Sequence, residues 1–311
     1  TEEGVSTENP FTLPTYGTRQ VVLEDLNSDG SKDIIFCGGG QVRIYWNNEG
    51  TFKIENPLIF KVKGLSTVFT TEAVRVDVSD VDADDIPDLI IATAEGVEIR
   101  SGDNLETVKS LIDVKNARWI TAADLDGDKL PELIISKQFD GNDYEVQSPI
   151  LWNGPDGYSL DRASWVTTIG VVGNTVGDLD GDGKQEVIFN NYMNGHVYSV
   201  PSYIYLGNAE ADYGVQNRLV FPNDQSNRSL VADLDLDGYP DLVFDKDLEY
   251  NDPEGYIRIY YSTPEGPNPD KFIDIDTGHT HFDIDITDFN RDGYLDLFVT
   301  SAVVKLTDDP K

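Results

Sequence analysis

The sequence predicts an all-β protein: a single β-propeller of four-stranded antiparallel blades, with six repeats visible in residues 1–311. Short runs rich in Val, Ile, Phe and Tyr are separated by Gly, Pro, Asn and Asp, which is typical of strands and turns. No apolar stripe with helical spacing is present. An acidic loop recurs six times, 44 to 55 residues apart, which indicates one supersecondary unit per repeat.

The acidic loop is clearest in Asp178-Leu-Asp180-Gly-Asp182-Gly183-Lys-Gln-Glu186. Carboxylates at loop positions 1, 3, 5 and 9 point inward when the backbone curls around a hard cation, and Gly at position 6 permits the positive φ of that curl. Oxygen ligands without His or Cys favour Ca²⁺, with Mg²⁺ and Mn²⁺ as alternatives. The six copies begin at Asp25, Asp80, Asp124, Asp178, Asp233 and Asp288.

An EF-hand is excluded, because it needs a bidentate Glu at position 12 and flanking helices. Position 12 is apolar in all six loops and lies in a strand-like run; the residues are Phe36, Ile91, Ile135, Phe189, Phe244 and Val299.

Each repeat predicts the same four strands. The first leads into the loop, as in 20–25 and 282–288, and the second leaves it as an apolar run, as in 33–36, 88–91, 132–135 and 241–244. A nearly continuous apolar run is expected of a strand that is covered on both faces. Third strands are predicted at 42–46, 97–100, 150–152, 203–205 and 257–261, and a fourth strand at 214–221. Radial repetition of such units is a propeller.

The expected repeats are 19–70, 74–116, 118–168, 172–222, 228–274 and 281–311, and segment 7–14 is expected to be a strand that completes another blade. Two arrangements remain open. The ring has six blades and is closed by segment 7–14, which removes exposed strand edges. Alternatively, the chain is part of a longer protein with more blades, such as a seven-bladed ring. The missing third strand after 295–300 favours the second arrangement.

The recurring pattern, an apolar residue before Asp-Φ-Asp/Asn-x-Asp-Gly-x-x-Asp/Glu and an apolar run after it, resembles the FG-GAP/VCBS repeat family. That family includes the integrin α-subunit head, several lectins, and bacterial and archaeal surface proteins. The resemblance implies a seven-bladed propeller whose loops bind Ca²⁺ on one face, while partners usually bind on the opposite face. It covers nearly the whole chain.

Matching each loop to the family motif implies up to six Ca²⁺ sites. The implied ligands are Asp25, Asn27, Asp29 and Asp33; Asp80, Asp82, Asp84 and Asp88; Asp124, Asp126, Asp128 and Glu132; Asp178, Asp180, Asp182 and Glu186; Asp233, Asp235, Asp237 and Asp241; and Asp288, Asn290, Asp292 and Asp296.

Two loops depart from the motif, because Asp85 and Lys129 stand where position 6 should be Gly. Asp tolerates a left-handed backbone better than Lys does, and Lys adds a positive charge. We therefore expect the Lys129 loop to bind Ca²⁺ most weakly. Asn27 and Asn290 each remove one charge, so the first and last loops should also be weaker than the fourth and fifth.

Net charge limits the classes of partner. The formal charge is −34, and six divalent ions would reduce it only to −22, which disfavours nucleic acid and anionic membranes. No apolar run reaches the length of a membrane-spanning helix. Cys37 is the single cysteine, so no intramolecular disulfide forms. Millimolar Ca²⁺ outside cells fills weak sites, so we expect an extracellular or cell-surface location. The acidity also fits a halophilic source.

The face opposite the metal loops is the predicted partner surface. Connections between the second and third strands are longer in the third, fourth and fifth repeats than in the first two, and loop insertions on one face often build a binding surface. Aromatic and His side chains there suit protein or sugar recognition. They are Phe139, Tyr144, Tyr192, His196, Tyr198 and Tyr250. The alternative is that these side chains only cover the underlying blades.

Other candidates are weaker. His279 and His281 would need a third ligand to hold a metal, and Trp46 and Trp152 stand at equivalent positions that favour blade core. Asn227 begins a glycosylation sequon that chance equally explains. No nucleophile motif or phosphate-binding Gly loop is present. The hypotheses are therefore a non-catalytic adhesion, recognition or surface-assembly module, which includes self-assembly; a carbohydrate-binding lectin; and the propeller part of a polysaccharide-active enzyme.

Overall fold

The computed structural model describes residues 12–64, 74–198, 200–208, 212–222, 225–246, 255–278 and 280–302. These residues form 24 β-strands and two 3-10 helices of three residues each, Leu160–Arg162 and Val215–Asn217. The all-β prediction is confirmed.

Five four-stranded antiparallel sheets follow one another along the chain. They consist of β1 (Thr18–Glu24), β2 (Asp33–Gly38), β3 (Gln41–Tyr45) and β6 (Leu58–Lys61); β7 (Arg75–Ser79), β8 (Asp88–Ala92), β9 (Val97–Arg100) and β10 (Val108–Ile112); β11 (Ala117–Ala123), β12 (Glu132–Lys137), β13 (Glu145–Leu151) and β14 (Ala163–Ile169); β15 (Gly173–Gly177), β16 (Glu186–Asn190), β17 (Ser202–Tyr205) and β18 (Arg218–Phe221); and β19 (Ser229–Ala232), β20 (Asp241–Lys246), β21 (Tyr256–Tyr260) and β22 (Phe272–Asp276). A small hairpin, β4 (Asn47–Asn48) with β5 (Thr51–Phe52), follows β3.

The expectation of six blades is corrected to five. Among the described residues the sixth repeat forms a two-stranded hairpin, β23 (Thr280–Thr287) with β24 (Asp296–Ala302). The described chain ends at residue 302, before any third strand of that repeat. Residues 7–11 of the predicted strand 7–14 lie outside the described residues, and residues 12–14 are in no strand.

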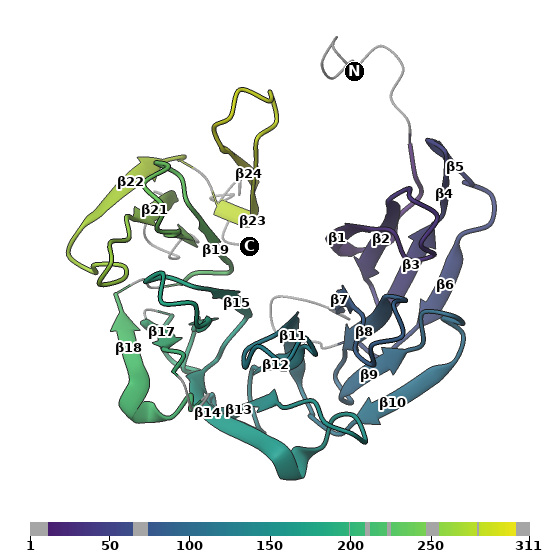
Figure 1. Ribbon diagram of the computed structural model, residues 1–311, viewed down its shortest axis with the longest axis horizontal. Helices are drawn as coiled ribbons and strands as arrows, with labels where there is room; N and C mark the ends of the chain where they lie inside the picture. The colour runs from purple at the N-terminus through teal and green to yellow at the C-terminus, as the bar shows by residue number, and fades with distance from the viewer. Residues whose placement is uncertain are drawn as a thin grey trace, which may run out of the picture.

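The sheets are arranged around a centre as propeller blades. Figure 1 shows the first strand of every repeat (β1, β7, β11, β15, β19 and β23) on the inside and the last strands on the outside. The first blade and the β23–β24 hairpin lie at the two ends of the arc. Each metal loop joins the inner strand to the second strand, so all six loops lie on one face and the beginnings of the inner strands lie on the other.

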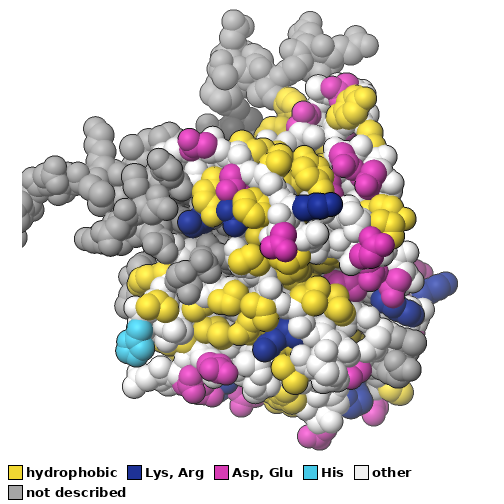
Figure 2. Space-filling view, turned by 90° about the vertical axis from the view of Figure 1, so that its left-hand side faces the viewer, with side chains coloured by type: hydrophobic (Ala, Val, Ile, Leu, Met, Phe, Trp, Pro, Cys, Tyr) yellow, Lys and Arg dark blue, Asp and Glu magenta, His cyan; other side chains and the backbone are white. Residues whose placement is uncertain are grey.

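Burial follows the position in the blade. The second strands β8 and β16 are buried at every residue, whereas the outer strand β22 is exposed at every residue. Ile273 and Ile275 of β22 and Val220 of β18 are among the exposed apolar residues. Figure 2 shows apolar side chains among acidic ones on the side of the molecule along which β18 and β22 lie. The main cores lie between blades, as where Ile35 and Val42 pack with Leu89 of the next blade.

Neighbouring inner strands are joined by side chains that bind backbone groups. The Gln20 amide accepts from Val76 N and donates to Val76 O, both at 2.9 Å. The Asp77 carboxylate accepts from Ala122 N of β11 at 2.7 Å, and the Thr175 hydroxyl donates to Ser229 O at 2.7 Å. These bonds satisfy backbone groups at the centre, where adjacent blades share no strand pairing.

We predict that Asp77 makes stability depend on pH. Burial raises the pKa of Asp77 to about 6, although its bonds to Ala122 N and Val78 N favour the ionised form. Since the folded pKa exceeds the unfolded value, protonation of Asp77 stabilises the fold at low pH, and this contribution is lost as pH rises through about 6. Asp77→Asn keeps an acceptor for Ala122 and removes the titration.

The measurement is denaturant unfolding of wild type and Asp77→Asn at several pH values with calcium held fixed. Wild type should lose on the order of 1 kcal/mol relative to Asp77→Asn between about pH 4 and pH 6. Asp285 stands at the same position of the sixth repeat and is exposed, so Asp285→Asn controls for the loss of one charge. Parallel pH curves for wild type and Asp77→Asn would contradict the prediction.

Candidate metal centres and the opposite face

The six acidic loops share one hydrogen-bond pattern. The carboxylate at position 1 accepts the N–H of position 6 at 2.7–2.9 Å in every loop. The carboxylate at position 5 accepts the N–H of position 7 at 2.7–2.9 Å in every loop. The sequence therefore specifies the curl of the loop through its own backbone, before any cation is considered.

The carboxylate at position 9 joins the loop to the rest of its blade. One oxygen accepts the N–H of position 2 in all six loops. In the five complete blades the other oxygen accepts an N–H from the segment that follows the third strand. These five carboxylates are at most 1% exposed; they are Asp33, Asp88, Glu132, Glu186 and Asp241.

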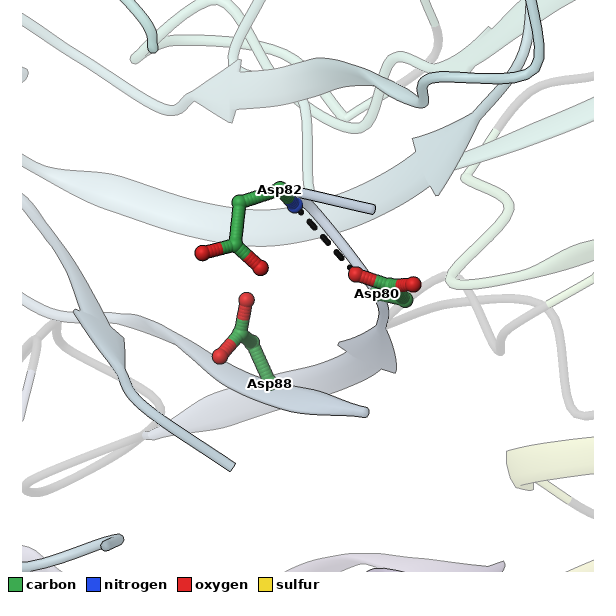
Figure 3. A group of neighbouring side chains, drawn as sticks. All are labelled: Asp80, Asp82 and Asp88. Carbon is green, nitrogen blue, oxygen red and sulfur yellow. Dashed lines mark hydrogen bonds between the residues drawn. The ribbon is translucent and has the colours of Figure 1, made fainter. Parts of the chain in front are cut away.

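Four loops bring carboxylates from positions 1, 3 and 9 together, with ligand atoms within 4.8 Å of one another. The groups are Asp80, Asp82 and Asp88; Asp124, Asp126 and Glu132; Asp178, Asp180 and Glu186; and Asp233, Asp235 and Asp241. Figure 3 shows the group of the second loop, in which the Asp82 and Asp88 carboxylates point toward each other and Asp80 approaches from the side. These acidic clusters can hold metal ions.

The fourth loop fits a divalent cation well. Burial, and to a smaller extent the nearby Asp180 and Asp178 charges, raise the pKa of Glu186 to about 7. Asp178 Oδ1 is shielded from solvent and has no hydrogen-bond partner among the described residues. A buried anion needs a compensating charge, and an oxygen-only donor set selects a hard cation such as Ca²⁺. Asp178, Asp180 and Glu186 would hold it.

The first and last loops differ because position 3 is Asn. The Asn27 amide donates to Asp29 Oδ2, and the Asn290 amide donates to Asp292 Oδ2, both at 3.0 Å. In these two loops the position 3 side chain thus supports position 5. The position 5 residues of the other loops lie outside the four acidic groups. Their assignment as direct ligands stays a prediction.

The backbone is left-handed at two loop positions, of which the motif predicts only position 6. Asp85 has φ 65° and Lys129 has φ 77°, so both non-Gly residues adopt the strained conformation. Position 4 is also left-handed in every loop, through Ser28, Ala83, Gly127, Gly181, Leu236 and Arg291. Sequence reasoning missed position 4, because its residue types share no preference for positive φ. Asp85 and Lys129 also line an open pocket of about 470 Å³ between the second and third loops.

Lys109 enters the second acidic group. Its ammonium forms a short contact with Asp82 Oδ2 and lies 3.4 Å from Asp88 Oδ2. Lys109 belongs to β10 of the same blade. Its charge therefore stands beside two of the three carboxylates that a metal would bind, which the sequence did not indicate.

Comparison with known proteins agrees with this geometry. A family model described as FG-GAP-like repeat matches residues 25–91, which include the first two acidic loops. The repeated loop and the blade arrangement extend the same pattern along the chain. The chain is a β-propeller that contains an FG-GAP-like repeat. No curated protein sequence matches it.

Solved structures with similar folds are distant. This chain is 18% identical to an Agrocybe aegerita lectin that recognises non-reducing terminal N-acetylglucosamine; the match has a TM-score of 0.49 and covers 92% of this chain and 71% of the lectin. This chain is 18% identical to the Vibrio cholerae biofilm matrix protein Bap1; that match has a TM-score of 0.41 and covers 79% of this chain and 39% of Bap1. It is 14% identical to the Photorhabdus luminescens Tc holotoxin pore, in a match that has a TM-score of 0.40 and covers 91% of this chain but only 13% of the toxin chain.

Four of the six predicted partner residues form two aromatic pairs on the face opposite the metal loops. Phe139 and Tyr144 have ring centroids 5.9 Å apart, and so do Tyr192 and Tyr198. A Cβ built on Gly195 would lie 2.9 Å from the Tyr144 ring, so the connections of the third and fourth blades touch. His196 is exposed beside them. We name these five predicted residues, without Gly195, the aromatic patch.

Other predicted residues fall elsewhere. Tyr250 and His279 lie outside the described residues, and the side chain of His281 does too. Trp46 and Trp152 pack against blade cores, as their equivalent positions indicated. No helix in the described ranges is long and apolar enough to cross a membrane.

We predict that Lys129→Gly strengthens cation binding by the third loop. The change removes a positive charge near Asp124 and relieves a left-handed backbone, which together contribute about 1–2 kcal/mol, or roughly tenfold in affinity. Native mass spectrometry over a series of free Ca²⁺ concentrations counts the ions. The matched control is Asp85→Gly, which relieves strain but also removes a negative charge, so it should gain less. An unchanged calcium series for Lys129→Gly would contradict the prediction.

We also predict that Lys109 competes with the metal in the second loop. Lys109→Met keeps the aliphatic stem and removes the charge beside Asp82 and Asp88. The variant should fill its last site at a lower free Ca²⁺ concentration than wild type, by about tenfold. Lys115→Met, which removes a charge paired with the exposed Asp113, serves as the control. Weaker binding by Lys109→Met would show that Lys109 supports the site instead.

Proposed function

We propose that this FG-GAP propeller is a non-catalytic, calcium-stabilised recognition module that works outside the cell or on its surface. The observation that carries the proposal is the set of four convergent acidic groups on one face. Each group holds three carboxylates of which one is buried, and mutual repulsion would weaken the loop without a cation. Calcium at millimolar extracellular concentration fills even weak oxygen sites.

The partner is assigned to the face opposite the metal loops. The aromatic patch supports this assignment because its rings lie at the surface, where Tyr combines an apolar face with a polar hydroxyl. Its four aromatic members are half-buried, and His196 is exposed. The metal ions would hold the blades in register from one face, while loops on the other face vary to fit the partner.

A carbohydrate ligand is the second candidate, favoured by the two aromatic pairs of the aromatic patch. The third, the propeller part of a polysaccharide-active enzyme, has no additional support, because the acidic pairs that glycoside hydrolysis would need coincide with the metal loops. We propose no catalytic role for the described residues.

Removal of calcium tests the structural role of the metal. A bound ion at 100 times its Kd stabilises the folded state by about 2.7 kcal/mol per site, so EDTA should lower the Tm by on the order of 10–20 °C. The loss should reverse on addition of Ca²⁺. Glu186→Gln keeps the hydrogen bonds of position 9 in part and removes its charge, and it should reduce the calcium-dependent part of the Tm. A chain that melts at the same temperature with and without EDTA would remove the metal from the proposal.

Replacement of aromatic residues tests the recognition face. A panel of immobilised glycans and purified extracellular-matrix proteins serves as the probe. Tyr192→Ala with Tyr198→Ala, changed together because their rings are in edge-to-face contact, should weaken the strongest interaction at least tenfold while the Tm in calcium changes little. Tyr294→Ala removes an exposed Tyr on the metal-loop face and is the matched control. If only the control Tyr294→Ala lost binding, the partner would bind on the metal-loop face, which would contradict the proposal.

A further inference from the structure

Four arginines gather at the centre of the face opposite the metal loops. Arg75 begins β7, Arg19 and Arg118 are the second residues of β1 and β11, and Arg228 directly precedes β19. Because these inner strands lie around the centre and all begin on this face, the four residues stand near the axis, one from each of four blades (Figure 1). The protein has only 23 Lys and Arg residues against 57 acidic ones, so this concentration of positive charge is unusual for the chain.

Trp119 shows that these side chains converge. The Arg75 guanidinium lies 5.1 Å from the centre of the Trp119 ring, and the Arg228 guanidinium lies 5.7 Å from it. Arg228 and Trp119 belong to the fifth and third blades, which are not neighbours. Gly173 begins the strand between them, and a Cβ there would stand 2.7 Å from Asn227 O. The missing side chain lets the segment that precedes Arg228 approach the backbone of the fourth blade closely.

The positive charges are only partly compensated. Arg228 pairs with Asp283, and Asp245 accepts the backbone N–H of Arg228. Arg75 donates a hydrogen bond to Val74 O at 3.2 Å, and the carboxylate charge that acts on it is that of Asp283, which already pairs with Arg228. Burial and the charges of Arg118 and Arg19 lower the pKa of Arg75 to about 9. Guanidiniums that repel one another in this way would gain from an added anion.

The surroundings limit which anion fits. A polyanion would be repelled by the acidic remainder of the surface, whereas a single carboxylate meets the arginines at the least cost. Guanidinium groups bind carboxylates in a planar, two-pronged geometry. Arg118 lies at the start of β11, on the same face as the connection that carries Tyr192 and Tyr198, and its charge interacts with Tyr192. Rings beside a cationic site suit a ligand that has an apolar face next to its carboxylate, as a carboxylated sugar has.

We propose that Arg75, Arg118 and Arg19 form an anion site that binds the carboxylate of a terminal acidic sugar, such as a uronic or sialic acid, while the aromatic patch contacts the sugar ring. This inference names the ligand class of the recognition face and therefore rests on the proposed function. Arg228, held by Asp283 and Trp119, orients Trp119 rather than binding the ligand.

Binding is measured on the calcium-loaded chain with glucuronic acid, N-acetylneuraminic acid and, as the neutral probe, glucose, by ligand-observed NMR and calorimetry. The acidic sugars should bind and glucose should bind at least tenfold more weakly. Arg75→Gln and Arg118→Gln should each weaken the acidic sugars about tenfold or more. Arg43→Gln is the matched control, because Arg43 also stacks on an aromatic ring, 5.0 Å from the Tyr16 centroid, but belongs to β3 and lies away from the axis.

The melting temperature distinguishes arginines that bind a ligand from arginines that only stabilise the fold. Arg75→Gln removes a partly buried charge that its neighbours repel, so its Tm without sugar should stay within a few degrees of wild type or rise. A large fall in Tm, with no acidic sugar bound by wild type, would overturn the site and make the arginines structural.

The glycan and protein panel separates this inference from the proposed function. Binding of neutral glycans or matrix proteins that depends on Tyr192 and Tyr198 but not on Arg75 would leave recognition intact and overturn the acidic-sugar site. Selective binding of an acidic peptide, tested with a short oligoaspartate, would also overturn it. Loss of all binding would contradict both.

Discussion

The buried carboxylate at loop position 9 is the interaction on which each complete blade depends. It accepts one backbone N–H from the acidic loop and another from the segment after the third strand, so three parts of the blade meet at a single side chain. Burying an ionised carboxylate is costly unless its charge is balanced. The buried charge at position 9 therefore needs a cation, and the carboxylates at positions 1 and 3 lie where they can help to bind one. The residue that joins the parts of the blade is thus also part of the group that can hold a metal ion.

The two faces of the propeller differ in how much their connections vary from blade to blade. On one face, short loops with nearly identical hydrogen bonds repeat from blade to blade, which leaves little freedom for specificity. On the other face, connections differ in length between repeats, and the inner strands begin with different residues. Opposite charges also separate in this way, with carboxylates gathered in the loops and arginines at the axis. A repeat protein can thus keep a uniform scaffold and vary one surface.

The centre of the propeller is stabilised differently from its blades. Within a blade, strand pairing satisfies the backbone; between blades, Gln20, Asp77 and Thr175 bind backbone groups of the next inner strand instead. Trp119 adds contacts that cross from the third blade to the fifth. These residues differ from repeat to repeat, because each inner strand meets a different neighbour. Their variety explains why the axis can carry a specific site although the repeats look alike.

The sequence by itself determined the all-β class, the repeat, the acidic loops and the strands on either side of them, because these features depend on local spacing and on side chains that bind their own backbone. It also placed the aromatic patch on the face opposite the acidic loops, since strand order fixes which connections share a face. Only the tertiary structure decided that the sixth repeat is a hairpin within the described residues, that Lys109 enters the second acidic group, and that position 4 is left-handed. The arginines around Trp119 were likewise invisible in the sequence. Such contacts join residues up to two blades apart, and no local pattern encodes how distant side chains meet at an axis.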